Sequence, residues 1–81
     1  MEFRNYLGYK VYENGNVENN KGVFLKSQFK NDFSFFKIKG KRISCARFVL
    51  FAFSIYPKSL NQKVKRKDSN PLNNSLENIS W

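Results

Sequence analysis

The sequence contains no histidine and a single cysteine, Cys45. One cysteine cannot form a disulfide within the chain, and one cysteine without histidine cannot supply the usual ligands of a zinc site. Because Cys45 stands in an apolar run, we expect it to be a small buried side chain. Without histidine, no Ser, Cys or Lys has the usual basic partner for nucleophilic catalysis.

Long hydrophobic runs, glycine-rich loops and acidic side chains are also scarce. The N-terminal region has no long apolar stretch, which argues against a signal peptide or a membrane span and predicts a cytoplasmic protein. No glycine-rich phosphate loop is present, and the glutamates show no sign of pairing for acid–base chemistry. We therefore predict that the chain is not an enzyme, has no cofactor or metal, and takes no small-molecule substrate.

The chain is rich in basic residues and in aromatic residues. Its 81 residues are enough for one small domain, residues 1–81, and 15 Lys and Arg against 6 Asp and Glu give a net charge of +9. Such a balance favours a polyanionic partner, most often nucleic acid, although a solvated basic surface needs no partner at all. The aromatic residues, 17% of the chain, are expected to fill a thin core rather than to stack on bases.

Residues 1–44 have the pattern of short strands separated by turns. Tyr9–Tyr12 alternates and leads into Asn14-Gly15, a strong hairpin signal because both residues accept positive φ. Further strands are expected over Val23–Leu25 and Phe33–Ile38. The turns between these segments are predicted at residues 19–22, 30–32 and 39–41.

Residues 45–56 are predicted to form the central helix. The segment Cys45–Phe53 is apolar except at Arg47, which shares one stripe with Ser44 and Ser54. The other side chains of the segment, including Phe51, should be buried. Pro57 should end the helix, since the residue before proline avoids helical angles.

The C-terminal segment, VKRKDSNPLNNSLENISW over Val64–Trp81, resembles the core of HNH endonucleases of the phage and intron-homing type. That family reads roughly V-N-H-x-D-G-N-x-x-N-N-x-x-x-N-L-x-W there. Tyr9–Val17 resembles an opening module that precedes many HNH domains. Ala46–Phe53 resembles the family helix H-R-L-V-A-x-A-F, with Ala46 in the place of its histidine.

The resemblance implies a nuclease framework whose chemical residues are replaced. Arg66 stands in the place of the family's general base, and arginine stays protonated at any relevant pH. Lys65 stands in the adjacent ligand position and offers no lone pair to a metal. The sequence stops at Trp81, where the family continues into a helix, so the motif is expected to be truncated. Asp68 and Asn78 match the motif, and we expect them to cap the loop and tie its backbone.

The remaining basic residues form two groups that could neutralise phosphates. The first lies along residues 37–47, where three lysines alternate, and the second leads into the C-terminal hairpin. The candidate nucleic-acid-binding residues are Lys37, Lys39, Lys41, Arg42, Arg47, Lys63, Lys65, Arg66 and Lys67, with Lys58 at the edge of the second group.

The sequence therefore predicts an α+β domain: a small curled antiparallel sheet packed on one central helix, followed by a truncated HNH-like hairpin over residues 57–81. The predicted function is metal-independent binding of the DNA phosphate backbone by a catalytically inactive phage or mobile-element accessory protein. The alternative is a phage-encoded inhibitor that occupies the nucleic-acid channel of a host enzyme, such as a defence nuclease.

Overall fold

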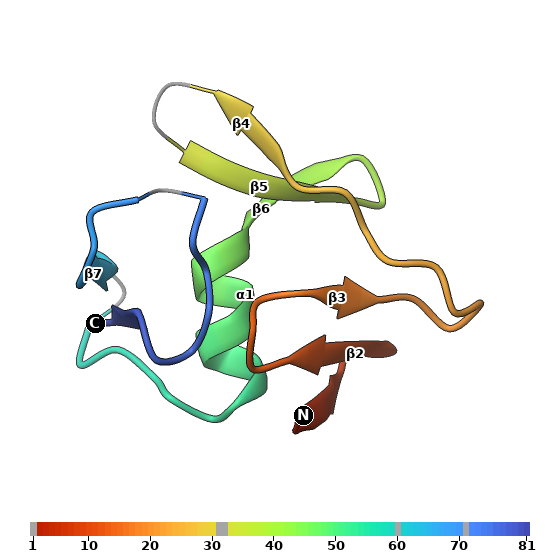
Figure 1. Cartoon of the computed structure of the whole chain (residues 1–81), viewed down its shortest axis with the longest axis horizontal. Helices are drawn as coiled ribbons and strands as arrows, with labels where there is room; N and C mark the ends of the chain where they lie inside the picture. The colour runs from red at the N-terminus through yellow and green to blue at the C-terminus, as the bar shows by residue number, and fades with distance from the viewer. Residues whose placement is uncertain (1, 31–32, 60, 71) are drawn as a thin grey trace.

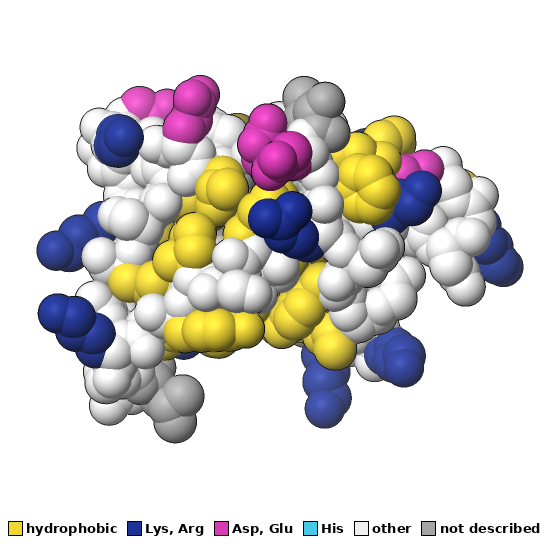
Figure 2. Space-filling model, turned by 90° about the horizontal axis from the view of Figure 1, so that it is seen from below, with side chains coloured by type: hydrophobic (Ala, Val, Ile, Leu, Met, Phe, Trp, Pro, Cys, Tyr) yellow, Lys and Arg dark blue, Asp and Glu magenta, His cyan; other side chains and the backbone are white. Residues whose placement is uncertain are grey.

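A single short helix lies at the centre of the computed structural model, which describes residues 2–30, 33–59, 61–70 and 72–81 (Figure 1). This helix, α1 (Cys45–Ala52), contacts strands of each of the three sheets that are described below. The molecule measures 31 × 26 × 23 Å. Seen from below, hydrophobic side chains are visible in a band across the surface, with Lys and Arg around it (Figure 2). Among the described residues, no helix has the length and apolar character needed to cross a membrane.

The first sheet is antiparallel and contains β1 (Phe3–Tyr6), β2 (Tyr9–Tyr12) and β3 (Val17–Glu18) in that order. The hairpin predicted at Asn14-Gly15 is confirmed: Gly15 has φ +94° and its N–H donates to the Tyr12 carbonyl at 2.9 Å. A Cβ at this glycine would lie 2.8 Å from a backbone carbonyl oxygen of a later loop. Gly15 therefore serves both the turn and a close backbone approach.

The second sheet contains β4 (Gln28–Lys30), β5 (Phe33–Ile38) and β6 (Lys41–Ser44). The predicted strand over residues 33–38 is confirmed. Lys39 and Gly40 both have positive φ, 52° and 78°, which is the signature of a two-residue type I′ hairpin turn. The turn predicted at residues 30–32 falls on positions 31–32, which lie outside the described residues.

Two expectations about the strands are wrong. Within the described parts of the chain the strands form two three-stranded sheets and a two-stranded pair, instead of one curled sheet. Residues 23–25 form no strand, because their ladder partner is the two-residue β3 and pairing is limited to a bridge between Glu18 and Phe24. The side chain of Asn19 closes this loop by accepting from two of its backbone N–H groups.

Helix α1 begins as predicted and ends earlier than predicted. The Ser44 hydroxyl caps its start by accepting from the Arg47 N–H at 3.4 Å. At the other end Ser54 adopts the left-handed conformation, φ 62°, so the helix stops at residue 52 and not at 56. The N–H of Ile55 bonds the Leu50 carbonyl and that of Ser54 bonds the Phe51 carbonyl, which is the Schellman arrangement. Local backbone geometry thus ends the helix before Pro57 can.

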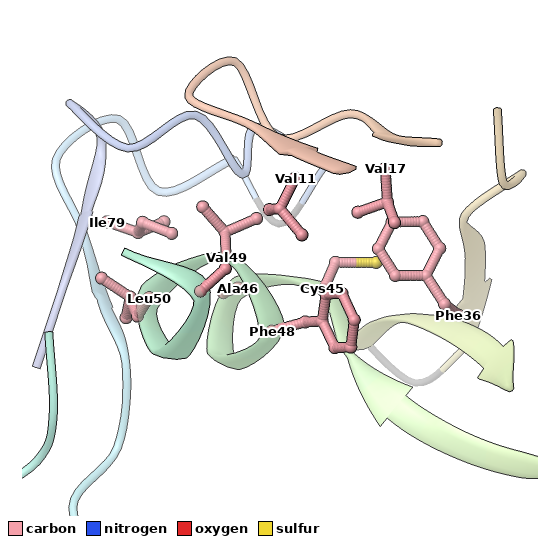
Figure 3. Packing of buried hydrophobic residues seen from close by; sticks show 10 residues of the cluster. Val11, Val17, Phe36, Cys45, Ala46, Phe48, Val49, Leu50 and Ile79 are labelled. Carbon is pink, nitrogen blue, oxygen red and sulfur yellow. The ribbon is translucent and has the colours of Figure 1, made fainter. Parts of the chain in front are cut away.

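The core surrounds one side of α1 and closes with Val11 and Val17 from the first sheet (Figure 3). Cys45 is fully buried, as predicted, and burial raises the pKa of its thiol to about 11. Phe51 and Phe53, predicted to be buried, are only half-buried. Phe51 lies one helical turn after Arg47 and so faces the same partly exposed stripe, where it packs against Tyr56 and Trp81.

Phe48 is the aromatic centre of this core. It is 2% exposed, and its ring makes edge-to-face contacts with Tyr6, Tyr9 and Phe36 at centroid distances of 5.0–6.3 Å. These rings come from both three-stranded sheets. Phe48 therefore couples the two sheets through the helix.

We predict that Phe48→Ala removes about 3–5 kcal/mol of stability, which unfolds or nearly unfolds a domain of this size. Thermal and chemical denaturation followed by circular dichroism measure the loss. Phe29→Ala is the matched control, because Phe29 is 48% exposed on β4 and should cost little. A wild-type melting curve for Phe48→Ala would contradict the assigned core.

Candidate nucleic-acid interface

A short C-terminal hairpin forms the first part of the site. β7 (Lys65–Arg66) pairs antiparallel with β8 (Ile79–Ser80), and a further bond runs from the Lys67 N–H to the Asn78 carbonyl at 2.9 Å. Ile79 is buried in the core against α1. Leu76 and Trp81 pack against the same cluster. One side of the hairpin thus packs against the core and α1, and the other side faces solvent.

The exposed side of the hairpin carries a row of lysines. Lys63, Lys65 and Lys67 are exposed, whereas the intervening Val64 and Arg66 are half-buried. Alternate residues of an extended chain project to the same side and are about 6.6 Å apart along it. We call these three residues the lysine row. The alternation Lys-Val-Lys-Arg-Lys was the sequence signal for it.

Arg66 points inward and is held by the loop that follows it. Its Nη1 donates to the backbone carbonyl of Asn73 at 2.8 Å. Burial lowers the pKa of the guanidinium from its usual value, while the nearby Asp68 carboxylate acts in the opposite direction. The group remains a cation at any relevant pH. Arg66, predicted as a phosphate contact, therefore has a structural role as well.

The loop between the strands is organised around the Asp68 carboxylate. Oδ1 accepts from the Asn70 N–H and from Asn78 Nδ2, both at 2.9 Å, and Oδ2 accepts from Asn73 Nδ2 at 2.7 Å. The Asn78 amide also accepts from the Asp68 N–H at 3.0 Å. The loop cap and backbone tie predicted for Asp68 and Asn78 are confirmed. We call these hydrogen bonds, with that of Arg66, the Asp68 network.

The same loop is fastened to the first two sheets. The Leu76 N–H donates to the Glu13 carbonyl at 2.6 Å, and Asn74 Nδ2 donates to the Ser34 hydroxyl at 3.2 Å. Asn74 is 7% exposed, and its backbone carbonyl lies against Gly15. The sequence carries no local signal for these contacts of Asn74, because the partners are 40 or more residues away.

The hydrogen bonds of Asp68 make this loop sensitive to acid. Donation by the Asn70 N–H and the Asn73 and Asn78 amides lowers the pKa of the Asp68 carboxyl below its ordinary value of 3.8. A carboxyl whose pKa is lower in the folded state stabilises the fold above the unfolded-state pKa. That contribution is lost as the pH falls through the folded-state pKa, below 3.8.

We predict that Asp68→Ala destabilises the domain at about pH 7, and that the difference from wild type shrinks toward about pH 3. The free energy of unfolding at several pH values measures this difference. Glu77→Gln removes an exposed carboxylate of the same loop and is the control. A pH-independent effect of Asp68→Ala would show that the carboxylate charge does not organise the loop.

The first basic group does not form the line that its spacing suggested. Lys39 stands in the type I′ turn, and Lys41 lies opposite Ile38 on β6, so Lys37, Lys39 and Lys41 do not share one strand face. Lys37 lies opposite Arg42 instead, and the Arg42 guanidinium covers the Phe35 ring at 5.1 Å. The strand alternation failed because a two-residue turn interrupts it.

Of the first basic group, residues 37–47, only Arg47 lies next to the C-terminal hairpin. The Arg47 guanidinium lies over the Trp81 ring at 5.0 Å, and Trp81 follows Ser80, the pairing partner of Lys65. The β5–β6 turn and β7 lie on opposite sides of the molecule (Figure 1). Arg47 therefore lies beside the hairpin, on the side where Trp81 packs, and residues 37–42 make up a separate surface.

The hairpin residues do not fit a divalent metal ion. Both Asp68 oxygens already accept hydrogen bonds, and the neighbouring side chains Lys65, Arg66 and Lys67 are cations that repel one. Across the described residues, no three His, Cys, Asp or Glu side chains are grouped so that they could hold a metal ion. What the surface offers is fixed positive charge, which suits phosphate.

Helix α1, packed on antiparallel strands and on the C-terminal hairpin, forms an HNH-like fold, as a comparison with a solved structure shows. The structure is similar to that of the HNH homing endonuclease I-HmuI, with a TM-score of 0.80 and 27% sequence identity. The match covers 100% of this chain and 52% of that one, so the chain spans about half of that protein. No protein-family model matches the sequence, and no curated protein matches it.

Proposed function

We propose that the protein binds DNA through the phosphate backbone, without a metal ion. The observation that carries this proposal is the lysine row, Lys63, Lys65 and Lys67, exposed on the hairpin of an HNH-like fold. I-HmuI, the structural neighbour, binds and cleaves DNA. Lysine ammonium groups neutralise phosphates as point charges and release the counterions bound there.

We further propose that this protein does not cleave the DNA that it binds. The resemblance to HNH nucleases puts Arg66 in the place of the general base, and its guanidinium donates to Asn73 instead of accepting a proton. A general base needs a free lone pair near neutral pH, which a guanidinium lacks. Asp68, the carboxylate nearest in sequence, is occupied by loop donors.

The proposed contacts carry little sequence information. Phosphate contacts fix the position of a protein on DNA, whereas base edges in the grooves specify sequence. The side chains of Asn70, Asn73 and Asn78 are used within the loop, so these amides are not free to read base edges beside the lysine row. Binding should therefore be similar for different sequences and strongly dependent on salt.

We predict that affinity for random DNA duplexes falls steeply with salt. With roughly four to six phosphate contacts, the slope of log K against log salt should be about −4 to −5. Replacing Lys63, Lys65 and Lys67 together by Gln should weaken binding to all sequences and flatten the slope by roughly 3. Fluorescence anisotropy across a salt series measures both quantities.

The matched control replaces three exposed lysines elsewhere, Lys21, Lys26 and Lys30, by Gln. It changes the net charge equally and should leave the slope nearly unchanged, because only contacted phosphates release counterions. If the wild type binds no DNA even at low salt, the proposal fails. The alternative role, inhibition of a host nucleic-acid enzyme by the same basic surface, would then be favoured and tested by capture of that enzyme.

A second prediction concerns cleavage. Supercoiled plasmid incubated with the purified protein and Mg²⁺, Mn²⁺ or Ni²⁺ should remain supercoiled, because the hairpin supplies neither a neutral base nor free ligands. Agarose-gel electrophoresis detects nicking. Metal-dependent nicking that persists after repurification, and that Arg66→Ala abolishes, would overturn the non-hydrolytic part of the proposal while leaving DNA binding intact.

A further inference from the structure

The outer face of the first sheet differs from the rest of the surface because it carries exposed aromatic rings and no net charge. Val11 and Val17 point into the core, so the alternate residues of β2 and β3 point outward. By strand register, Phe3 lies opposite Tyr12, and the bridge places Phe24 opposite Glu18 on this same outward side. We call this side the outer face.

An aromatic row crosses the outer face. The Phe3 and Tyr12 ring centroids are 5.5 Å apart, and those of Tyr12 and Phe24 are 5.8 Å apart. Phe3 is 40% exposed and Phe24 is 55% exposed. Adjacent rings that stay this accessible make a contiguous apolar patch, which in soluble proteins usually marks an interaction surface.

Charge is distributed unevenly between this sheet and the rest of the chain. Residues 1–25 carry three basic and three acidic side chains and are neutral, so the whole net charge of +9 belongs to residues 26–81. Two copies that approach through their basic surfaces repel each other. The outer face offers an approach without that repulsion, and it offers little attraction to a polyanion.

The outer face carries one positive and one negative side chain, so its charges can pair with those of the same face on a second copy. Lys10 lies directly opposite Glu18 in the strand register, so one positive and one negative side chain stand side by side. Glu18 is held in place by the Tyr12 hydroxyl, which donates to Oε1 at 2.7 Å. An open hollow of about 350 Å³ is lined by these charges and by Asn5, Asn19 and Asn20, and Lys10 Nζ lies over the Phe3 ring at 5.2 Å. An apolar centre with a polar rim is the usual composition of a protein interface.

We propose that the outer face is the contact between two copies of this chain in a two-fold symmetric dimer. In such a contact the same patch faces itself, and a residue i that touches j is matched by j touching i. The two-fold axis brings Lys10 of each copy against Glu18 of the other, and the aromatic rows pack between them. A second copy is thus the occupant that matches both the rings and the charges.

The dimer leaves the lysine row of each copy exposed. β2 and β3 lie on the opposite side of α1 from β7 (Figure 1). Two copies joined through the outer face therefore carry their lysine rows at the two far ends. If the proposed DNA binding holds, one dimer joins two DNA segments, or binds one long segment with increased avidity.

Sedimentation equilibrium of the full chain, without DNA, tests the dimer independently of DNA binding. A contact made by three rings and one pair of opposite charges per copy is small, so we expect a weak dimer with a dissociation constant on the order of 10–100 µM. Lys10→Glu alone or Glu18→Lys alone should raise that constant about tenfold or more, because like charges then face each other. An equimolar mixture of the two variants should restore association, since the heterodimer pairs every charge with its opposite.

Phe24→Ser should likewise abolish association, whereas Phe29→Ser, which removes an equally exposed ring from the second sheet, should not. Thermal melts confirm that each variant is folded. The proposal is overturned if the wild type stays monomeric at about 500 µM, well above the expected constant. It is also overturned if the dimer survives Phe24→Ser, or if the mixed charge variants do not associate more strongly than either alone.

Discussion

Burial of one short, almost wholly apolar helix is the constraint on which this structure depends. α1 has eight residues, too few to be stable alone, and six of them are buried. Each sheet has only two or three strands and is also marginal by itself. Stability therefore comes from their joint packing, which Phe48 exemplifies by contacting rings from both larger sheets.

The C-terminal hairpin shows how a polar network can hold a loop that has almost no core of its own. The Asp68 network joins a carboxylate, a guanidinium and three asparagines within residues 66–78, and Ile79 supplies the apolar anchor. Removing a cation from water is costly, so the half-buried Arg66 is tolerated because the Asn73 carbonyl and the Asp68 charge compensate it. The positive charge that remains uncompensated is on the exposed lysines.

Local signals in the sequence predicted the local features well. The Asn14-Gly15 turn, the strand over residues 33–38 and the start of α1 follow from turn chemistry, alternation and capping, which act over a few residues. The division into separate sheets was not predictable, because it depends on which strand finds which partner. The alternation Lys-Val-Lys-Arg-Lys is a local signal for the exposed lysines, but the contact that holds Arg66 was not predictable, because the Asn73 carbonyl lies in a loop whose path depends on tertiary packing.

The distribution of charge connects these features to function. A domain with +9 spread evenly would resist self-association and would bind polyanions on every side. Here a neutral aromatic sheet face is separated by α1 from a basic hairpin, so the two proposed contacts use different surfaces (Figure 1). The Asp68 network matters to this separation, since it turns Arg66 inward and so leaves only lysines, which adapt to phosphate without fixed geometry, on the outside. The proposed phosphate binding rests on this arrangement, in which an HNH-like fold presents lysine charges on the exposed side of its hairpin.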